Sequence, residues 1–428
     1  MPEYYWIETL GCPKNQVDSD KIAGTLVADG LIPAKSADDA DVIVVNTCAF
    51  IDAARQESID TIEDFVAGRK DGTRIVVTGC LAARSGEELA AAIPEIDYVA
   101  DVGVPIALSD GPRWRSDALR TESHRLMDLP RSKPDLPWAY VKIAEGCDRA
   151  CGFCAIPTFR GPQASRTIES IRREVELLDV KEVVLVAQDL ASFGNDRDER
   201  GSITELVRRV APLVERVRLL YLYPSSLTDA LIETIIETGV SYFDLSLQHV
   251  SPQLVRRMRR FGNAERFLQR IDFIRSLDES AAFRSSFILG YPGETEDDHD
   301  RLLEFLEAAD LDWVGFFPYS KEEGTFAAGL DGQVPRELAL ERLRECAELQ
   351  DVITARKRRE LVSTTQMCLI DAPGVARSFR EAPEIDGIIR VDDRIPVGTM
   401  SKIEIVAAEG PDLIGSPIGG QPFARVSR

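Results

Sequence analysis

Short apolar runs alternate with amphipathic stretches along the first 133 residues of the chain. The runs are rich in β-branched and aromatic residues, which is typical of buried strands, and they lie at residues 4–10, 42–46 and 74–78. Between the runs, apolar residues recur every three or four positions, as they do on the buried face of a helix. This alternation predicts a parallel sheet flanked by helices. We therefore expect an N-terminal α/β domain over residues 1–133.

The alternation resumes after a linker over residues 111–137, which is rich in Pro, Arg, Ser and Asp. In a second predicted domain, residues 138–361, amphipathic helices separate six apolar runs at residues 139–143, 183–186, 218–223, 242–247, 284–289 and 314–318. Six β/α units predict a partial barrel, whose open side suits a large substrate. Its reactive groups should lie at the carboxyl ends of the strands, as they do in complete barrels.

The last segment, residues 362–428, has a different pattern. Its apolar runs are short, are punctuated by Gly and Pro, and lie at residues 367–370, 387–391 and 401–406. The pattern predicts a small antiparallel β-barrel, a fold that commonly presents a binding face to polymers. From residue 361 onward acidic residues slightly outnumber basic ones, whereas an RNA-binding barrel is more often basic.

Charge and composition narrow the function classes. The net charge is −21 at pH 7, and a protein that grips nucleic acid usually carries a basic surface instead. The acidic balance favours a basic protein partner, although many soluble proteins are simply acidic. The chain has no long apolar run and no signal peptide, so we expect a soluble, cytoplasmic protein without a membrane partner. In a reducing compartment its eight cysteines are expected to be metal ligands or core residues rather than disulfides.

Three of these cysteines, Cys147, Cys151 and Cys154, form a C-x3-C-x2-C run after the first predicted barrel strand; we call them the barrel triad. Thiolate-only sites favour iron–sulfur clusters or zinc. Structural zinc normally takes four protein ligands, and no second cysteine pair at ligand spacing follows here. A four-iron cluster on three cysteines leaves one iron open to a substrate or cofactor. The spacing resembles the signature of the radical S-adenosylmethionine (SAM) enzymes, with zinc and plain buried cysteines as the alternatives.

Another triad is spread along the N-terminal domain. Cys12, Cys48 and Cys80, which we call the N-terminal triad, each follow one of the three predicted strands next to a small residue. Because ligands gather at the carboxyl ends of parallel strands, these cysteines should meet at one edge of the sheet. The alternative is that they are small core residues, as we expect for Cys346 and Cys368, which have no partner at ligand spacing. The pattern favours a second three-cysteine cluster.

Residues at other strand ends are candidate SAM contacts by the same resemblance. They are Gln188 after the second barrel strand, Gln248 after the fourth and Gly290 after the fifth. His249 is either a general base or a hydrogen-bonded structural residue. Two arginines beyond the third cysteine of the barrel triad either offset the charge of a cluster or lie in a surface turn: Arg160 and Arg166.

Across nearly its whole length the chain resembles the methylthiotransferases, which join a three-cysteine domain, a radical SAM barrel and a small C-terminal barrel called TRAM. The two triads together carry this resemblance. Further runs are similar to the branch that modifies a ribosomal protein rather than tRNA: GCPKNQVD at 11–18, CAIP at 154–157, AQD at 187–189, QH at 248–249, EEGT at 322–325 and APEIDG at 382–387. The tRNA branch usually has other residues after the third cysteine and a basic TRAM barrel.

The resemblance implies SAM and two 4Fe–4S clusters as cofactors. The barrel triad would be the catalytic centre, where SAM is cleaved to a 5′-deoxyadenosyl radical. That radical would take hydrogen from the β-carbon of an aspartate in ribosomal protein S-twelve, at the decoding centre of the small subunit. The N-terminal triad would hold the cluster that presents a methylated sulfur. A reductant such as flavodoxin or ferredoxin and a sulfur donor would be partners. The alternatives are a tRNA adenosine methylthiotransferase and a non-catalytic iron–sulfur electron-transfer protein.

Overall fold

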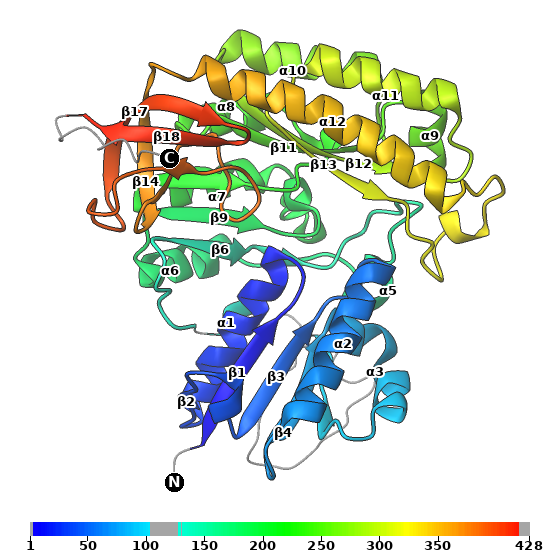
Figure 1. Ribbon diagram of the computed structural model, residues 1–428, viewed down its shortest axis with the longest axis vertical. Coiled ribbons are helices and arrows are strands. Elements are labelled where there is room, and N and C mark those ends of the chain that lie inside the picture. Colours follow the sequence, from blue (N-terminus) through cyan, green and yellow to red (C-terminus); the bar gives the residue numbers. More distant parts are fainter. Residues whose placement is uncertain (1–2, 103–126, 130, 419–428) are drawn as a thin grey trace, which may run out of the picture.

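Five parallel strands form the N-terminal sheet, in the order β2-β1-β3-β4-β5. They are β1 (Tyr4–Thr9), β2 (Ile32–Pro33), β3 (Val42–Thr47), β4 (Arg74–Gly79) and β5 (Tyr98–Val99). The connecting helices are α1 (Pro13–Ala28), α2 (Asp52–Gly68) and α3 (Cys80–Ala92), which pack on the sheet (Figure 1). β3 is buried along its whole length, as befits the central strand of a covered parallel sheet. The predicted α/β arrangement is confirmed.

The computed structural model describes residues 3–102, 127–129 and 131–418. Most of the predicted linker, residues 111–137, therefore lies outside the described residues. Among the helices in the described part of the chain, none combines the length and the apolar character that a membrane span requires.

Six parallel strands make the central domain, in two sheets of three. They are β6 (Trp138–Lys142), β9 (Glu182–Val186), β10 (Arg216–Leu219), β11 (Tyr242–Gln248), β12 (Ala282–Leu289) and β13 (Trp313–Pro318). A β-bridge between Leu222 and Leu245 joins the two sheets, so the strands follow one another in chain order around an open barrel. The partial barrel predicted from six β/α units is confirmed.

Helices cover the outside of this barrel (Figure 1). They are α6 (Ile168–Leu178), α7 (Ser202–Val210), α8 (Asp229–Glu237), α10 (Ala264–Leu277), α11 (Glu296–Ala309) and α12 (Arg336–Glu360). Shorter elements lie at the carboxyl ends of the strands: β7 (Ala144–Glu145), α5 (Ile156–Arg160), β8 (Ala164–Ser165) and α9 (Pro252–Arg257). The outward side chains of the strands and the inner faces of the helices form the largest apolar core.

The third barrel strand ends earlier than its sequence predicts. The apolar run 218–223 predicts a strand, but β10 ends at Leu219 because Tyr221 adopts a left-handed conformation with φ +65°. The backbone N–H of Tyr221 donates to Oδ2 of Asp244 at 2.9 Å, which holds this turn. Such a conformation is strained for a bulky residue and is often found at functional sites.

A closed five-stranded barrel forms the last domain, in the order β14-β15-β16-β18-β17. Its strands are β14 (Thr365–Ala372), β15 (Val375–Arg377), β16 (Ile389–Arg390), β17 (Met400–Glu409) and β18 (Asp412–Pro417). The pairs are antiparallel as predicted, except that β16 and β18 run parallel.

This last domain closes the amino end of the central barrel. The first residues of β6, β11, β12 and β13 share one buried apolar cluster with Ala382 of the last domain. The hydroxyl of Tyr242 donates to Oδ2 of Asp386 at 2.6 Å. The run 382–387 is therefore packed against the central barrel, and the carboxyl ends of the strands are left as the open side.

Candidate functional site

The N-terminal triad lies at the carboxyl edge of the five-stranded sheet. Cys12 precedes α1, Cys48 follows β3 and Cys80 begins α3 directly after β4. Burial, together with the neighbouring thiols of Cys80 and Cys12, raises the pKa of Cys48 to about 11. The three thiols are therefore neighbours at one edge of the sheet.

Glycine is required beside this triad. Gly11 has φ +94°, and a Cβ added to it would lie 2.8 Å from Sγ of Cys48. Gly79 has the same φ, and a Cβ there would lie 2.5 Å from the backbone oxygen of Thr47. A side chain at either position would combine backbone strain with a steric clash. The two glycines thus let the cysteines that follow them approach Cys48.

Arg160 connects this triad to the central barrel. It belongs to α5, the helix that follows the barrel triad, yet its Nη2 donates to Sγ of Cys80 at 3.0 Å and to Oδ1 of Asn15 at 2.7 Å. Its Nη1 donates to Asp18 at 3.1 Å and to Glu145 at 3.0 Å. Arg160 is buried, so its interpretation as a surface residue is wrong. It lies against the N-terminal triad and offsets charge there.

Lys142 completes a buried network of four charges at this junction. From β6 it donates to Asp18 of α1 and, at 2.6 Å, to Glu145. Burial alone would raise the pKa of Glu145, but Arg160 and Lys142 hold it at about 2. Removing one partner from a buried ion network leaves the others uncompensated, which is costly. The network therefore fixes the N-terminal domain on the barrel.

The barrel triad lies in the loop between β7 and α5. Sγ of Cys147 accepts the backbone N–H of Arg149 at 3.4 Å, and Sγ of Cys151 accepts Nη1 of Arg260 at 3.3 Å. Burial raises the pKa of Cys147 to about 11, with added contributions from Asp189 and Cys151. Burial raises the pKa of Cys154 to about 12, and the thiols of Cys151 and Cys147 add to this shift. These three thiols also share one site.

Two backbone hydrogen bonds hold the loop of the barrel triad from outside. The N–H of Gly152 donates to the oxygen of Met258 at 2.8 Å, and the N–H of Ala327 donates to the oxygen of Gly152 at 2.7 Å. A Cβ on Gly152 would lie 2.9 Å from the hydroxyl of Tyr291. The loop is therefore clamped between the segment after α9 and the segment after β13.

Both triads offer the thiolate-only donor sets that iron–sulfur clusters favour. A four-iron cluster takes its cysteines at separate corners. Arg160 and Arg260 supply positive charge next to the thiols of the two triads. The donor sets and their charge balance fit two clusters.

The three candidate SAM contacts lie at or just beyond the ends of strands but have different surroundings. Gln188 donates to Glu145 at 2.5 Å, while its Oε1 has no partner among the described residues. Gln248 ends β11 with φ +73° and is partly exposed. Gly290 has φ +75°, and a Cβ there would lie 2.4 Å from Cβ of Ala339. The space beside Gly290 is thus filled by α12, whereas Gln188 keeps an acceptor free.

Other candidate residues have structural surroundings. His249 is buried, its Nδ1 accepts the N–H of Ser251 at 3.1 Å, and burial lowers its pKa to about 4. Arg166 is buried and pairs with Asp128 and Glu174 rather than with a triad, so it does not lie in a surface turn. Cys346 and Cys368 lie in apolar cores, as predicted.

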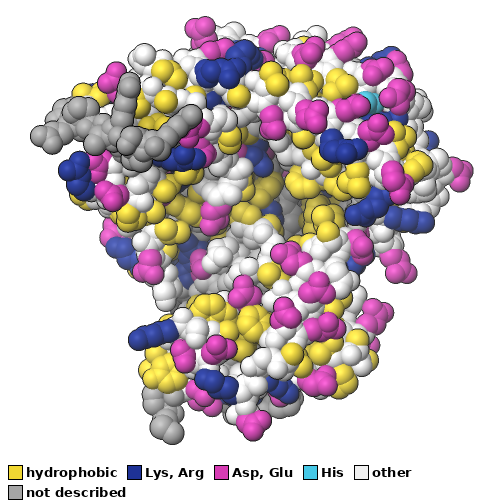
Figure 2. All heavy atoms as spheres, in the orientation of Figure 1, with side chains coloured by type: hydrophobic (Ala, Val, Ile, Leu, Met, Phe, Trp, Pro, Cys, Tyr) yellow, Lys and Arg dark blue, Asp and Glu magenta, His cyan; other side chains and the backbone are white. Residues whose placement is uncertain are grey.

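Sequence reasoning missed Lys14. It lies in the first turn of α1, and its Nζ is 3.6 Å from the centroid of the Tyr221 ring. Although burial raises the pKa of the nearby Cys12, Lys14 and backbone N–H groups bring it below its ordinary value. The surface is hollowed above the N-terminal domain (Figure 2). The only signal in the sequence was the lysine within the run at 11–18.

Lys14 differs from the other lysines, all of which lie among the described residues. Five pair with a carboxylate: Lys21, Lys133, Lys142, Lys181 and Lys357. Four are exposed: Lys35, Lys70, Lys321 and Lys402. Lys14 is partly enclosed and has no carboxylate partner in the described chain, so its ammonium is available to an anionic ligand.

Three family models match the chain in succession. "Uncharacterized protein family UPF0004" covers residues 4–101, "Radical SAM superfamily" residues 141–306 and "TRAM domain" residues 365–418. Among solved structures, the radical SAM methyltransferase TsrM of Kitasatospora setae has a TM-score of 0.50 at 13% identity, over 83% of this chain and 90% of that one. This likeness concerns the fold alone. The domains and the cysteine sites together define a radical SAM enzyme.

Close relatives narrow this class. "Ribosomal protein uS12 methylthiotransferase RimO" of Moorella thermoacetica is 41% identical over 416 residues, which are 93% of this chain and 95% of that protein. The proteins of the same name from Thermotoga maritima and Streptomyces coelicolor are 38% and 37% identical, over 96% and 99% of this chain and 99% and 98% of their own. The chain therefore belongs to the RimO family of uS12 methylthiotransferases. It is a transferase that uses SAM and two 4Fe–4S clusters.

Proposed function

We propose that this chain attaches a methylthio group to the β-carbon of an aspartate in ribosomal protein uS12. The supporting observation is the Arg160 link, in which one buried guanidinium contacts Cys80 of one triad and Glu145, close before the other. Sulfur insertion needs radical generation and sulfur delivery within reach of the same carbon, and positioning of this kind is worth many orders of magnitude in rate. The proposed domains are residues 1–133, 138–361 and 362–428.

In this proposal each triad holds one 4Fe–4S cluster: Cys12, Cys48 and Cys80 in the N-terminal domain, and Cys147, Cys151 and Cys154 in the barrel. When bound, the barrel cluster supplies the electron that cleaves SAM, which makes an unactivated C–H bond reactive. Gln188 and Gln248 offer polar groups to SAM at their strand ends, and Gly290 is the third proposed contact. Arg160 and Lys142 hold the two domains, and so the two sites, in register.

Lys14 is proposed to bind the carboxylate of the target aspartate. The Tyr221 ring covers one side of its ammonium and stabilises the charge, which leaves the other donors for a ligand. A carboxylate is the natural partner of a partly enclosed, unpaired ammonium. Because the β-carbon is bonded directly to the carboxylate carbon, this contact brings the reacting carbon close to the N-terminal triad. An adenosine has no carboxylate to satisfy Lys14.

The reaction also needs a reductant and sulfur. A radical SAM enzyme requires a one-electron reductant, and we propose flavodoxin or ferredoxin in that role. A separate sulfur donor is proposed because the six thiols of the two triads are assigned as cluster ligands.

A competition experiment tests the substrate. The reconstituted chain is incubated without oxygen with SAM, reductant, a sulfide source and equimolar uS12 and tRNA, and both products are analysed by mass spectrometry. The proposal expects the methylthio group on an aspartate of uS12. Modification of tRNA alone would establish the tRNA alternative instead. Failure to form 5′-deoxyadenosine under reduction would support the non-catalytic electron-transfer alternative.

A further inference from the structure

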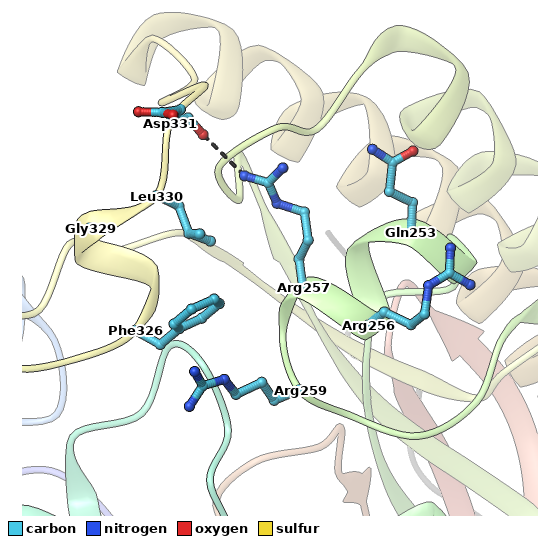
Figure 3. A pocket seen from close by; sticks show the side chains of 8 residues that line it. All are labelled: Gln253, Arg256, Arg257, Arg259, Phe326, Gly329, Leu330 and Asp331. Atoms are coloured by element: carbon cyan, nitrogen blue, oxygen red, sulfur yellow. Dashed lines mark hydrogen bonds between the residues drawn. The ribbon is translucent and has the colours of Figure 1, made fainter.

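An arginine-lined pocket of about 650 Å³ adjoins the loop of the barrel triad (Figure 3). One wall is α9 with Arg256 and Arg257, followed by Arg259. The other wall is the segment 326–331, which follows β13. Arg257 and Arg259 reach across toward that segment from the α9 side.

The arginines of this pocket have no acidic partner in the described part of the chain, although the net charge of the chain is −21. Within the described residues, Arg256, Arg257 and Arg259 form no ion pair. Asp331 lies in the pocket wall, but Arg257 donates to its backbone oxygen, at 3.1 Å, rather than to its carboxylate. Nε of Arg257 is buried without a hydrogen-bond partner. An unsatisfied buried donor beside unpaired cations points to an anionic ligand.

Phe326 orders one of these cations. The guanidinium carbon of Arg259 lies 3.8 Å from the centroid of the Phe326 ring. Arg259 has a left-handed backbone, with φ +53°, at the turn after α9. A guanidinium that lies on an aromatic ring keeps the N–H groups of its edge free for a carboxylate or phosphate. The pocket is therefore arranged for an anion before any ligand binds.

The pocket walls are the same segments that clamp the loop of the barrel triad. Met258, between two of the arginines, accepts the N–H of Gly152, which directly follows Cys151. On the other wall, Ala327 follows Phe326 and donates to the oxygen of Gly152. A single hydrogen bond thus separates the arginine segment from the residue next to a cluster ligand, which is a short route for an electron.

We propose that this pocket is the docking site for an acidic protein that carries one electron to the barrel triad, an inference that rests on the proposed function. One electron leaves the reduced carrier and enters the cluster at the barrel triad, and the carrier is left oxidised by one electron. Carboxylates of the carrier supply the partners that the three arginines lack. A local basic pocket matters because the overall negative charge of the chain repels an acidic protein, and complementary charges mainly raise the rate of encounter.

RNA phosphates near uS12 are the competing anionic partner. The position of the pocket against the loop of the barrel triad favours the electron carrier, because of these two partners the reductant is the one that must approach the cluster to pass its electron. Substitution of the two outer arginines, Arg256 and Arg259, distinguishes an electron carrier from RNA as the partner of the pocket. Arg257 is left unchanged in these variants because its guanidinium packs closely against Gly293. A Cβ added to that glycine would lie 3.1 Å from the guanidinium carbon.

The test compares the wild-type chain with Arg256→Glu/Arg259→Glu. Formation of 5′-deoxyadenosine is measured with reduced flavodoxin and, separately, with dithionite, which needs no docking surface. We expect the flavodoxin-driven rate to fall about tenfold or more and to lose most of its salt dependence, while the dithionite-driven rate stays unchanged. The dissociation constant of oxidised flavodoxin, measured by calorimetry, should rise by a similar factor.

The matched control is Arg208→Glu/Arg209→Glu, which reverses two exposed arginines on α7 and should change neither rate. Arg256→Gln/Arg259→Gln removes the positive charge without adding negative charge. If the flavodoxin-driven rate falls in this variant too, the loss cannot be due to a folding defect caused by the two glutamates. Unchanged flavodoxin binding and flavodoxin-driven rate would overturn the proposal, as would a selective loss of modification on small ribosomal subunits. A wild-type chain that never cleaves SAM would instead refute the proposed function.

Discussion

The two ends of the central barrel both contain dense buried charge, but they use it differently. At the amino end, Glu182 pairs with Arg218 at 2.8 Å and with Arg377 at 3.1 Å, while Asp386 pairs with Arg284 at 2.6 Å. These pairs lie where the last domain closes the barrel. Each of these arginines has a carboxylate partner, as expected for charges whose role is to hold two domains together.

The carboxyl end is built from the same residue types but leaves specific groups unmatched. Arg160 divides its donors between the carboxylates of Asp18 and Glu145 and the thiol of Cys80. Among the described residues, Lys14 has no carboxylate partner, and Gln188 keeps a buried acceptor without a hydrogen-bond partner. Unmatched groups are costly when buried, so the ones that lie beside the two triads point to the functional site.

The largest expected effect is a loss of stability at the amino end. Glu182→Gln removes the carboxylate shared by Arg218 and Arg377. Arg377 keeps its pair with Asp371, but the buried guanidinium of Arg218 loses its carboxylate partner. We expect a loss of about 3–5 kcal/mol in the free energy of unfolding, measured with urea. Glu205→Gln on α7, which breaks an exposed pair, should cost no more than about 1 kcal/mol. Equal losses in the two variants would contradict the account of the amino end.

His249 shows that a residue at the carboxyl end can still be structural. Burial lowers its pKa from 6.5 to about 4, so between these values the unfolded chain binds a proton that the folded chain excludes. The stability that neutral His249 contributes is complete above about pH 6.5 and is lost as the pH falls toward 4, up to roughly 3 kcal/mol. As the pH falls from about 6.5 toward 4, the free energy of unfolding measured with urea should therefore decrease less steeply in His249→Gln than in the wild type. Parallel curves would show that the histidine is not the titrating group.

Arg160 is the positioning residue at the junction of the two triads. Arg160→Met should lower methylthio transfer by about a hundredfold, because small displacements of a reacting group are that costly. The ratio of 5′-deoxyadenosine to methylthiolated product should rise, and the electron paramagnetic resonance signal of the N-terminal cluster should shift. Arg160→Lys should restore part of the coupling.

Arg166→Met is the matched control for this substitution, since Arg166 is equally buried but contacts neither triad. The folded fraction of Arg166→Met should keep the wild-type ratio of 5′-deoxyadenosine to methylthiolated product. A raised ratio in both variants would reduce Arg160 to a general structural residue.

Lys14 is expected to have the smallest of these effects. Lys14→Met keeps most of the aliphatic stem but removes the charge, and should raise KM for uS12 by about tenfold, the usual size of a lost charged hydrogen bond. The sharper readout is discrimination: the wild type should prefer uS12 over a uS12 with Asn at the target aspartate, and Lys14→Met should lose that preference. Lys35→Met, an exposed lysine of the same domain, is the control. An unchanged preference in Lys14→Met would remove Lys14 from substrate recognition.

The sequence predicted the features that depend on local pattern. Alternating strands and helices predicted the parallel sheet and the open barrel, and the strand-end positions of Cys12, Cys48 and Cys80 predicted neighbouring thiols. The direction of Arg160 was not predictable, because it depends on how the N-terminal domain packs on β6. Tyr221 was expected inside a strand, since nothing in an apolar run signals that Asp244 will hold its backbone in a left-handed turn.

The run 382–387 shows the same limit. The sequence marked it only as similar to the branch that modifies a ribosomal protein. In the structure Asp386 pairs with Arg284 and accepts a hydrogen bond from Tyr242 of the central barrel. Local sequence identified the run, but only the long-range packing of the two barrels shows that it holds them together.

The division of labour between the two triads is the central claim. It is tested most directly by replacing Cys12, Cys48 and Cys80 together with Ala in one variant, and Cys147, Cys151 and Cys154 in another. Each reconstituted variant is assayed for iron by Mössbauer spectroscopy, for 5′-deoxyadenosine and for methylthiolated uS12. We expect each variant to keep one 4Fe–4S cluster, and only the first to form 5′-deoxyadenosine, with no methylthio transfer by either. Normal product from the first variant, or loss of all iron from a folded variant, would contradict the claim.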